Sequence, residues 1–272
     1  MEKQSMIINN ILSNDNLNCA YKQVIKNKGA AGVDGMECEA LFSHLRTNGA
    51  QLKESIRNQA YNPLPVRRVE IPKEDGSKRK LGIPTVKDRF IQQAVAQVLT
   101  PIYERIFHRN SYGFRPEKSA QQAVLKAVEY MNDGYNWVVD IDLEKFFDTV
   151  NHNKLISILN KEIKDGKVLS LIRKFLVSGV MVGEHMEETE IGTPQGGNLS
   201  PLLANIILNE LDWELEKRKL KFVRYADDCI ILVKSQKAAK RVMDSIVKYI
   251  ESKLLLKVNR KKSKIGRPIE IK

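Results

Sequence analysis

The chain has 272 residues, 42% of them hydrophobic, which is enough to bury a core as one large domain or two intimate subdomains. Its three cysteines, Cys19, Cys38 and Cys229, are odd in number and lack metal-ligand spacing, which argues against a disulfide framework and a zinc site. No apolar run approaches the length of a membrane span and the N-terminus has no signal-peptide core, so we expect a cytoplasmic protein with no membrane partner.

The net charge of +12 is distributed unevenly along the chain. Residues 1–56 are neutral overall, residues 57–126 carry +8, residues 127–233 carry −6 and residues 234–272 carry +10. A basic run is usually only a solvated face. An acidic middle between basic flanks, however, is expected where metal ions sit at a centre and a polyanion is held around it, so the pattern favours nucleic acid as a partner.

Hydrophobic periodicity predicts helices and short strands, with no internal repeat and no Gly/Ser linker that would mark a domain boundary. Turn residues at 62–65 and 74–77 bracket the extended segment 66–72, which predicts a β-hairpin projecting from helices. The expected helices are 5–28, 37–58, 87–107, 119–133, 152–162, 167–178, 201–219 and 237–256, and the expected strands are 66–72, 137–142, 180–183, 222–226 and 229–233.

A glycine-rich loop at 192–198 precedes the helix expected at 201–219. Ser200 is a good N-cap for that helix and Pro201 is well suited to its first position. The three glycines of the loop permit close approach of the backbone to a ligand, although a purely structural turn would use them as well.

Two strand ends in this sequence carry acids. The strand at 137–142 contains Asp140 and Asp142, and the strands at 222–226 and 229–233 meet at Asp227 and Asp228, which predicts a β-hairpin with two carboxylates at its tip. Because side chains alternate across a strand, two adjacent acids require a departure from regular geometry there. A solvated turn explains most isolated acid pairs. Acids at two strand ends instead fit a two-metal phosphoryl-transfer site, since Mg²⁺ prefers oxygen ligands.

Together these motifs resemble the reverse transcriptases encoded by group II introns, which combine reverse transcription with splicing (maturase) activity. The resemblance runs through nearly the whole chain in family order. Residues 194–205, with Pro-Gln-Gly-Gly continued by Asn-Leu-Ser-Pro-Leu-Leu-Ala-Asn, look like the group II class in particular. The motifs that carry it lie at residues 29–35, 79–89, 112–116, 142–148, 193–205, 225–228 and 259–263.

The resemblance implies an α+β fold, the fingers and palm of a right-hand polymerase, whose palm is an antiparallel sheet backed by helices. Residues 1–130 would be fingers with an N-terminal extension, and residues 131–272 would be palm with fingers elements interleaved. The thumb and the C-terminal domains of the family would be absent from this chain.

The resemblance also implies two Mg²⁺ ions, with Mn²⁺ as a substitute. In the first acidic strand, the metal-binding Asp of the family has an aromatic residue five positions later, which selects Asp142, followed by Phe147, over Asp140. Since Asp140 and Asp142 would share a face, alternation alone leaves that choice open. The metal ligands implied are Asp142, the backbone carbonyl of Leu143, Asp227 and Asp228.

Several residues match positions that bind the incoming dNTP. Lys73 and Arg79 match the fingers residues that hold the triphosphate, with Lys78 or Lys80 as alternatives in the same basic tract. Gln195 matches a residue near the sugar and the templating pair.

Two further residues are assigned to the chemistry. Phe147 matches the aromatic ring that would collide with a 2′-hydroxyl and favour dNTPs, although an ordinary core Phe is the alternative. Lys262 matches a lysine near the leaving pyrophosphate, a candidate general acid in a tract that could also be a solvated face.

The expected partners are group II intron RNA, an RNA template with a DNA primer, and dNTP, and a homodimer is left open. RNA contacts are expected from Arg67, Arg68, Arg109 and Arg115. A non-enzymatic RNA-binding splicing cofactor is the main alternative, and both roles can coexist in one molecule. An RNA-dependent RNA polymerase is disfavoured by Phe147 and by Ala226, where that class commonly has Gly.

Overall fold

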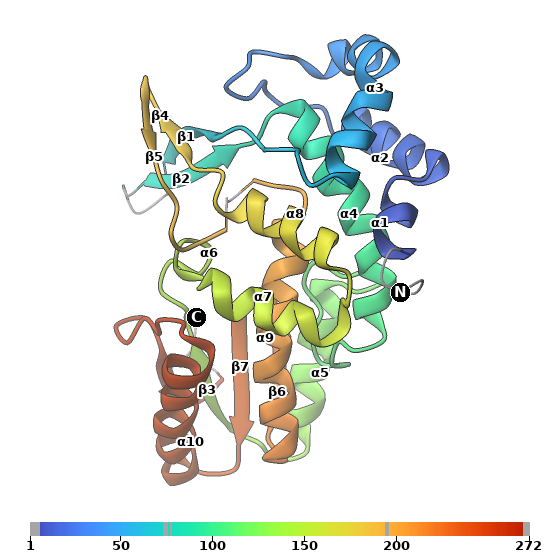
Figure 1. Cartoon of the computed structure of the whole chain (residues 1–272). Coiled ribbons are helices and arrows are strands. Elements are labelled where there is room, and N and C mark those ends of the chain that lie inside the picture. The colour runs from blue at the N-terminus through green and yellow to red at the C-terminus, as the bar shows by residue number, and fades with distance from the viewer. Residues whose placement is uncertain (1–5, 73–75, 77, 194–195, 269–272) are drawn as a thin grey trace. The chain divides into compact units, whose positions relative to one another are not determined.

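The computed structural model describes residues 6–72, 76, 78–193 and 196–268 (Figure 1). Two of the expected dNTP-binding residues, Lys73 and Gln195, lie outside the described residues. The chain divides into two compact units: unit 1 is Met1–Ile102 with Leu155–Ser200, and unit 2 is Tyr103–Lys154 with Pro201–Lys272. In the part of the chain that the structure describes, no helix has the length and apolar character needed to cross a membrane.

Unit 1 is mainly helical. The helix expected at 5–28 is in fact two helices, because the hydroxyl of Ser13 accepts a hydrogen bond from the backbone N–H of Asn16 (3.3 Å) and so begins a new helix. A carboxylate oxygen of Asp165 accepts from the backbone N–H of Ile8 (3.0 Å). The helices are α1 (Met6–Ile11), α2 (Asn14–Asn27), α3 (Leu41–Arg57, after a 3₁₀ turn at Cys38–Ala40), α4 (Val86–Glu104, ending in unit 2), α7 (His152–Glu162, beginning in unit 2) and α8 (Gly166–Leu176).

The sheet of unit 1 contains the expected hairpin. Strands β1 (Val66–Pro72) and β2 (Lys78–Ile83) pair antiparallel, as the flanking turn residues predicted. The strand order is β2-β1-β4-β5, with β4 (Val180–Val182) parallel to β1 and β5 (His185–Glu187) antiparallel to β4. Strand β5 was missed because its three residues are all exposed and carry no apolar alternation.

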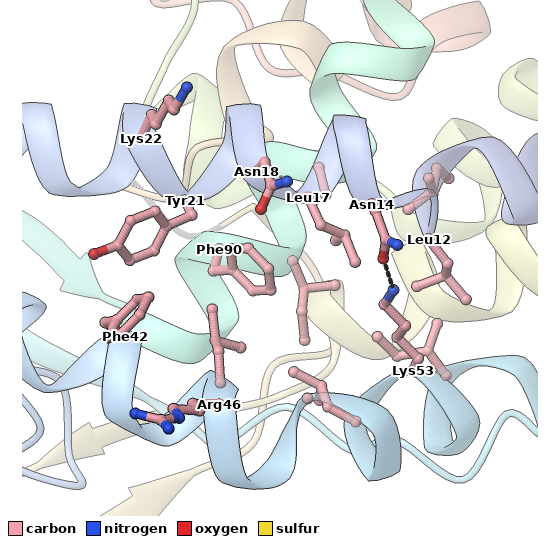
Figure 2. Close-up of a pocket in the computed structure, with 17 residues that line it drawn as sticks. Leu12, Asn14, Leu17, Asn18, Tyr21, Lys22, Phe42, Arg46, Lys53 and Phe90 are labelled. Atoms are coloured by element: carbon pink, nitrogen blue, oxygen red, sulfur yellow. Dashed lines mark hydrogen bonds between the residues drawn. The ribbon is translucent and has the colours of Figure 1, made fainter.

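A cavity of about 610 Å³ opens between α2 and α3, with residues of α4 on its wall (Figure 2). Its lining is mostly apolar and includes Phe90, and Lys53 reaches across it to donate a hydrogen bond to the amide oxygen of Asn14 (2.5 Å). Gly49 of α3 also lines it, and a methyl group added there would meet no atom within 4 Å. This side of unit 1 is therefore loosely packed.

Unit 2 is built on one antiparallel sheet of order β6-β7-β3-β8, in agreement with the expected antiparallel sheet. Strand β8 was not expected, since three residues give too short a pattern. The strands are β3 (Trp137–Ile141), β6 (Lys221–Tyr225), β7 (Asp228–Val233) and β8 (Lys264–Gly266).

Helices cover this sheet. Helix α5 packs on β6 and β7, and α10 packs on β3, β7 and β8. Ser119 forms a capping box with Gln122 at the start of α5, and Ser235 caps α10 through its hydroxyl. The helices of unit 2 are α5 (Ala120–Asn132), α6 (Phe146–Thr149), α9 (Ser200–Lys217, beginning with the expected Ser-Pro) and α10 (Gln236–Tyr249, continued by a π turn at Ile250–Leu254).

Candidate active site

The two adjacent acids occupy different positions in the β6–β7 hairpin. Tyr225 pairs with Asp228, so Ala226 and Asp227 form a two-residue loop, and Asp228 is the first residue of β7. Ala226 has φ +57°, a left-handed conformation that costs roughly 1–2 kcal/mol for a residue with a Cβ. The departure from strand geometry expected at the tip is therefore present, and it lets both carboxylates project from the same hairpin end.

Strand register brings the other acidic strand beside this hairpin. Asp140 of β3 pairs with Ile230 of β7, and Ile141 pairs with Cys229. Continuing the register by one residue brings Asp142 opposite Asp228. Paired residues share a face of a sheet, so Asp140, Asp142 and Asp228 project from one face.

The carboxylates interact electrostatically. Asp228 is exposed overall, but partial shielding from water, followed by the charges of Asp227, Asp140 and Asp142, raises the pKa of its carboxyl. Partial burial and the charge of Asp142 likewise raise the pKa of Asp140, while Lys264 opposes the shift. Mutual repulsion of this kind is expected where acids converge without a cation between them.

The oxygen-only donors fit a hard cation, although they are not drawn together in this structure. Among the described residues, no group of three or more His, Cys, Asp or Glu side chains lies close enough to hold a metal ion. Strand register places the backbones of Asp142 and Asp228 opposite one another, and their role as metal ligands stays a prediction.

The backbone around Asp142 is held by a segment about 120 residues away. The carbonyl of Asp142 accepts from the N–H of Asn259 (2.8 Å), and its N–H donates to the hydroxyl of Ser263 (3.1 Å). Leu143 faces Val258 as a non-hydrogen-bonded antiparallel pair, which turns the carbonyl of Leu143 away from that segment. Sequence reasoning recognised residues 259–263 as a motif but missed this clamp.

Lys262 lies in the same turn, one residue before Ser263, and is exposed. The clamp at Ser263 thus brings the Lys262 backbone near that of Asp142. Its role as a general acid stays a prediction.

Phe147 is half-buried in α6, beside the fully buried Phe146, with their ring centroids 5.2 Å apart. The core position is therefore taken by Phe146. Phe147 keeps part of its ring accessible, as a residue that contacts a sugar must, and that contact itself stays a prediction.

A neighbouring loop packs tightly against the hairpin tip. A Cβ added to Gly113 would lie 2.2 Å from the backbone nitrogen of Ala226. Only glycine permits this approach, so the loop that contains Gly113 forms a support directly behind the acidic turn. Sequence reasoning quoted this loop as a motif without assigning it that role.

The expected triphosphate-binding residues that are described lie on the β1–β2 hairpin of unit 1. Arg79 is exposed and pairs with Ile71, on the same face of the hairpin as Arg67. Lys78 forms an ion pair with Glu70 (2.8 Å) on the other face, which makes it less available than Arg79 for a phosphate.

The expected RNA-binding arginines have different surroundings. Arg67 donates from Nε to the carbonyl of Ala31 (3.0 Å), and Arg68 is half-buried. The side chain of Arg109 is 79% exposed, 3.8 Å from Glu216.

Arg115 differs from the others because its side chain is only 5% exposed. Its guanidinium donates to Glu104 and to the carbonyls of His108 and Ser111. The structure therefore gives Arg115 a role inside unit 2, and the RNA contact expected for it stays a prediction.

The glycine-rich loop at 192–198 is explained in part by packing. Gly196 has φ +118°, and a Cβ there would lie 2.7 Å from the carbonyl oxygen of Gly82. Here the close approach is to the protein's own backbone and not to a ligand. This supports the interpretation of Gly196 as part of a structural turn.

Comparison with known proteins decides the family. A family profile described as "Reverse transcriptase (RNA-dependent DNA polymerase)" matches residues 71–271. This chain belongs to the reverse transcriptase family. The antiparallel sheet with its acidic hairpin is thus part of a reverse transcriptase fold, as the sequence motifs predicted.

Named relatives narrow the class. The chain is 41% identical over 212 residues to the group II intron-encoded protein LtrA of Lactococcus lactis subsp. cremoris, covering 78% of this chain and 35% of that protein. It is 34% identical over 287 residues to protein YkfC of Escherichia coli (strain K12), covering 90% of this chain and 75% of that protein. The expected resemblance to group II intron-encoded reverse transcriptases is confirmed, and the chain spans about a third of LtrA and three quarters of YkfC.

A solved structure described as "Partial Cas6-RT-Cas1--Cas2 complex" has a similar fold, with a TM-score of 0.55 and 28% sequence identity. The match covers 90% of this chain and 42% of that chain. The likeness therefore extends over nearly all of the reverse transcriptase described here.

Proposed function

We propose that this chain is the RNA-directed DNA polymerase domain of a group II intron maturase, transferring nucleotides from dNTP to a primer 3′-hydroxyl and binding intron RNA in support of splicing and mobility. The observation that carries the proposal is the register of β3 against β7, which brings Asp142 opposite Asp228, beside Asp227 in the turn. Partial burial and then the charges of the neighbouring acids raise the pKa of the Asp228 carboxyl, and acids gathered at a strand end in this way are suited to holding cations and have no obvious role in a pure binding protein.

In this proposal, Asp142, Asp227, Asp228 and the carbonyl of Leu143 hold two Mg²⁺ ions, with Asp227 as the more direct ligand of the turn pair. The bound ions would supply Lewis-acid stabilisation of the attacking and leaving oxygens. The hydrogen bonds from Asn259 and to Ser263 hold the backbone from which the Asp142 carboxylate projects.

Other residues select and bind the nucleotide. The accessible part of the Phe147 ring occupies the space of a 2′-hydroxyl and so favours dNTP. Lys262 gives a proton to the leaving pyrophosphate. Lys73 and Arg79 bind the triphosphate, and Gln195 contacts the sugar and the templating pair.

Intron binding is a second role, favoured by the exposed cations of the β1–β2 hairpin. Arg79 and Lys80 are exposed and Arg68 is half-buried, and the side chains of the three form no ion pair or hydrogen bond with another described residue, although the charges of Lys80 and Arg68 help to lower the pKa of Glu70. Cations that are not used inside the protein are available for phosphates, which dominate affinity for nucleic acid.

The substitution Asp227→Asn tests the proposal in the intact protein. Removing one carboxylate charge should abolish cDNA synthesis while RNA affinity and splicing support persist. The exposed acid Asp133, in the same unit, provides the control Asp133→Asn, which should leave synthesis unchanged. Undiminished synthesis by Asp227→Asn would reject the catalytic assignment, and loss of synthesis with intact splicing would show that both roles exist.

A further inference from the structure

Arg224 of β6, two residues before the Ala226–Asp227 turn, is completely buried, with 0% of its surface exposed. A buried guanidinium is costly unless it is paired and its donors are satisfied. Asp212 of α9, also fully buried, accepts from Nε (2.8 Å) and from Nη2 (2.6 Å) of Arg224. The pair is therefore a bidentate ion pair inside unit 2, and sequence reasoning assigned neither residue a role.

The other donors of Arg224 are also used. Nη1 donates to the amide oxygen of Asn205 (2.9 Å) and to the backbone carbonyl of Ala226 (2.7 Å), and Nη2 donates to the hydroxyl of Ser111 (2.7 Å). All five N–H groups of the guanidinium thus have an acceptor. The planar fork of donors leaves the group little freedom to move.

The bond to Ala226 is the important one for the site. Ala226 is the first residue of the turn, and its carbonyl belongs to the peptide that leads into Asp227. This bond therefore fixes the orientation of the peptide from which Asp227 projects. It also supports the left-handed backbone of Ala226, which is intrinsically unfavourable.

The side chain of Arg224 lies on the face of the sheet opposite to that of Asp228. Arg224 pairs with Cys229, whereas Asp228, one residue earlier in β7, projects to the other face. The guanidinium therefore lies on the face of the sheet opposite to Asp228, and none of its five hydrogen bonds goes to the carboxylates of Asp227 or Asp228. Arg224 can act on them only through the backbone.

The same network holds the loop behind the turn. Asn205 donates to the carbonyl of Gly113 (2.8 Å), the residue in closest approach to Ala226. The backbone N–H of Tyr112 donates to the carbonyl of Arg224 (2.9 Å), and the N–H of Arg224 donates to the carbonyl of Asn110 (2.9 Å). Both supports of the turn, from Arg224 and from Gly113, thus depend on one set of buried polar groups.

We propose that Arg224, fixed by Asp212 and Asn205, is a positioning residue that orients the Ala226–Asp227 peptide for metal binding and polymerisation. This inference rests on the proposed function. A buried ion pair is seldom more stabilising than an apolar pair of similar volume. Apolar side chains, however, cannot donate to the Ala226 carbonyl, so positioning explains why charge is retained at this place.

The test replaces the ion pair with apolar residues, Arg224→Met with Asp212→Leu, in the intact protein. Because no unpaired charge remains, the fold should persist, with a lower melting temperature since Asn205, Ser111 and the Ala226 carbonyl lose a donor. Positioning predicts that affinity for Mn²⁺, titrated by electron paramagnetic resonance without substrate, falls by about 10- to 100-fold, the usual effect of removing support from metal ligands. In primer extension, kcat should fall while affinity for primer and template is unchanged.

A matched control is available at the C-terminal end of the same helix. Glu214 of α9 and Arg218, the residue just after that helix, form a partly exposed ion pair (2.7 Å), and Arg218 contacts Ser245 and not the turn. Arg218→Met with Glu214→Leu should leave Mn²⁺ affinity and kcat at the parent level. Equal losses in both double variants would show a general effect of removing ion pairs and would overturn the proposal.

Should the first double variant not fold, Arg224→Lys provides the same test. It keeps a cation beside Asp212, but an ammonium on a flexible stem cannot reproduce the fork of bonds that includes Ala226. Reduced Mn²⁺ affinity in folded Arg224→Lys supports positioning, and parent affinity in either folded variant overturns it. Asp227→Ala in the same titration separates the proposed function from the positioning role of Arg224. If Asp227→Ala binds Mn²⁺ as the parent does, the proposed function is wrong. If Asp227→Ala loses Mn²⁺ affinity and the Arg224 variants do not, only the positioning role is wrong.

Discussion

Charged side chains are buried and paired near the acidic turn of unit 2, whereas on the β1–β2 hairpin of unit 1 they are exposed. Around the acidic turn of unit 2, Arg224 and Asp212 are fully buried and satisfy one another, and Gly113 packs against the turn with no room for a methyl group. On the hairpin of unit 1, Arg79 and Lys80 are exposed on strands whose distal residues face water.

The difference follows from what each region would have to do. Cation binding by carboxylates requires positions defined to a fraction of an ångström, since small misplacements of a reacting group are expensive. Close packing and buried hydrogen bonds supply that definition. Phosphates of an extended RNA are bound largely by charge, which acts at longer range and tolerates mobile side chains. The comparison therefore predicts sharp losses from small changes in unit 2 and graded losses from large changes on the hairpin.

The largest effect should come from the acids themselves. Alanine at Asp142, Asp227 or Asp228 should lower polymerisation by at least about 100-fold, since even the outer partners of metal ligands are worth ~10- to 100-fold. RNA affinity should stay nearly unchanged, because affinity depends on cations elsewhere. Primer extension and filter binding on the same preparations measure both. If folded variants lose RNA affinity together with activity, the assignment of catalysis to these acids and of RNA binding to cations elsewhere is wrong.

The next effect tests the tight packing in unit 2. Gly113→Ala adds a Cβ 2.2 Å from the Ala226 nitrogen, so the turn has to shift. We expect activity to fall by about 10- to 100-fold and stability by about 1–3 kcal/mol. The control is Gly166→Ala at the start of α8, where the added Cβ meets nothing within 4 Å and should change neither. Parent activity in Gly113→Ala would mean that the turn tolerates displacement.

A third change separates two adjacent aromatic rings. Phe147→Ala should raise the use of rNTP relative to dNTP by about tenfold or more, because the half-buried ring no longer blocks the 2′ position. Phe146→Ala should instead destabilise the fold by about 3–5 kcal/mol, since that ring is in the core. Competition between labelled dNTP and rNTP measures the first effect and chemical denaturation the second. An unchanged nucleotide ratio in active Phe147→Ala would reject the steric role.

Sequence patterns were sufficient for the acidic hairpin because its signal is local. Apolar runs on both sides of Asp227 and Asp228 predicted β6, β7 and the turn, and the strand before Asp142 had the same character. Flanking turn residues also predicted the hairpin that contains β1, although no strand was predicted at Lys78–Ile83, where β2 lies. Strands of three residues, such as β5 and β8, contain too few positions for a pattern.

The hydrogen bonds and the ion pair that hold the site could not be predicted from the sequence, because they join residues far apart along the chain. In the sequence, nothing distinguishes Arg224 from an ordinary exposed cation of a strand. Its burial and its ion pair with Asp212 are known only from the structure. Ser263 contacts Asp142 across 121 positions, and no spacing rule connects them. The break between α1 and α2 could have been found, since Ser13 is a standard N-cap residue, but continuous periodicity outweighed it.

The graded response expected on the hairpin can be measured as salt dependence. Each phosphate contact contributes a slope of about −0.7 for single strands and −0.9 for duplex DNA in a plot of log affinity against log salt. Arg68→Glu should flatten the slope for RNA by about one contact. Arg67→Glu should flatten it less, because Arg67 already donates to the Ala31 carbonyl. Arg109→Glu provides a third point in unit 2. If the slope of log affinity against log salt is nearly flat for the parent, or is the same in all three variants, these arginines do not bind the RNA phosphates.

The smallest effect concerns the loosely packed side of unit 1 and is the counterpart of Gly113. Gly49 lies inside α3 with open space where a Cβ would be, so Gly49→Ala should stabilise the protein by about 0.5–1 kcal/mol through helix propensity alone. Gly134 also has open space, but its φ of +88° makes alanine strained, so Gly134→Ala should lower stability instead. Urea denaturation measures both, and polymerisation by Gly49→Ala should match the parent. Destabilisation by Gly49→Ala would mean that the cavity wall is as closely packed as the acidic turn, and the contrast between the two units would not hold.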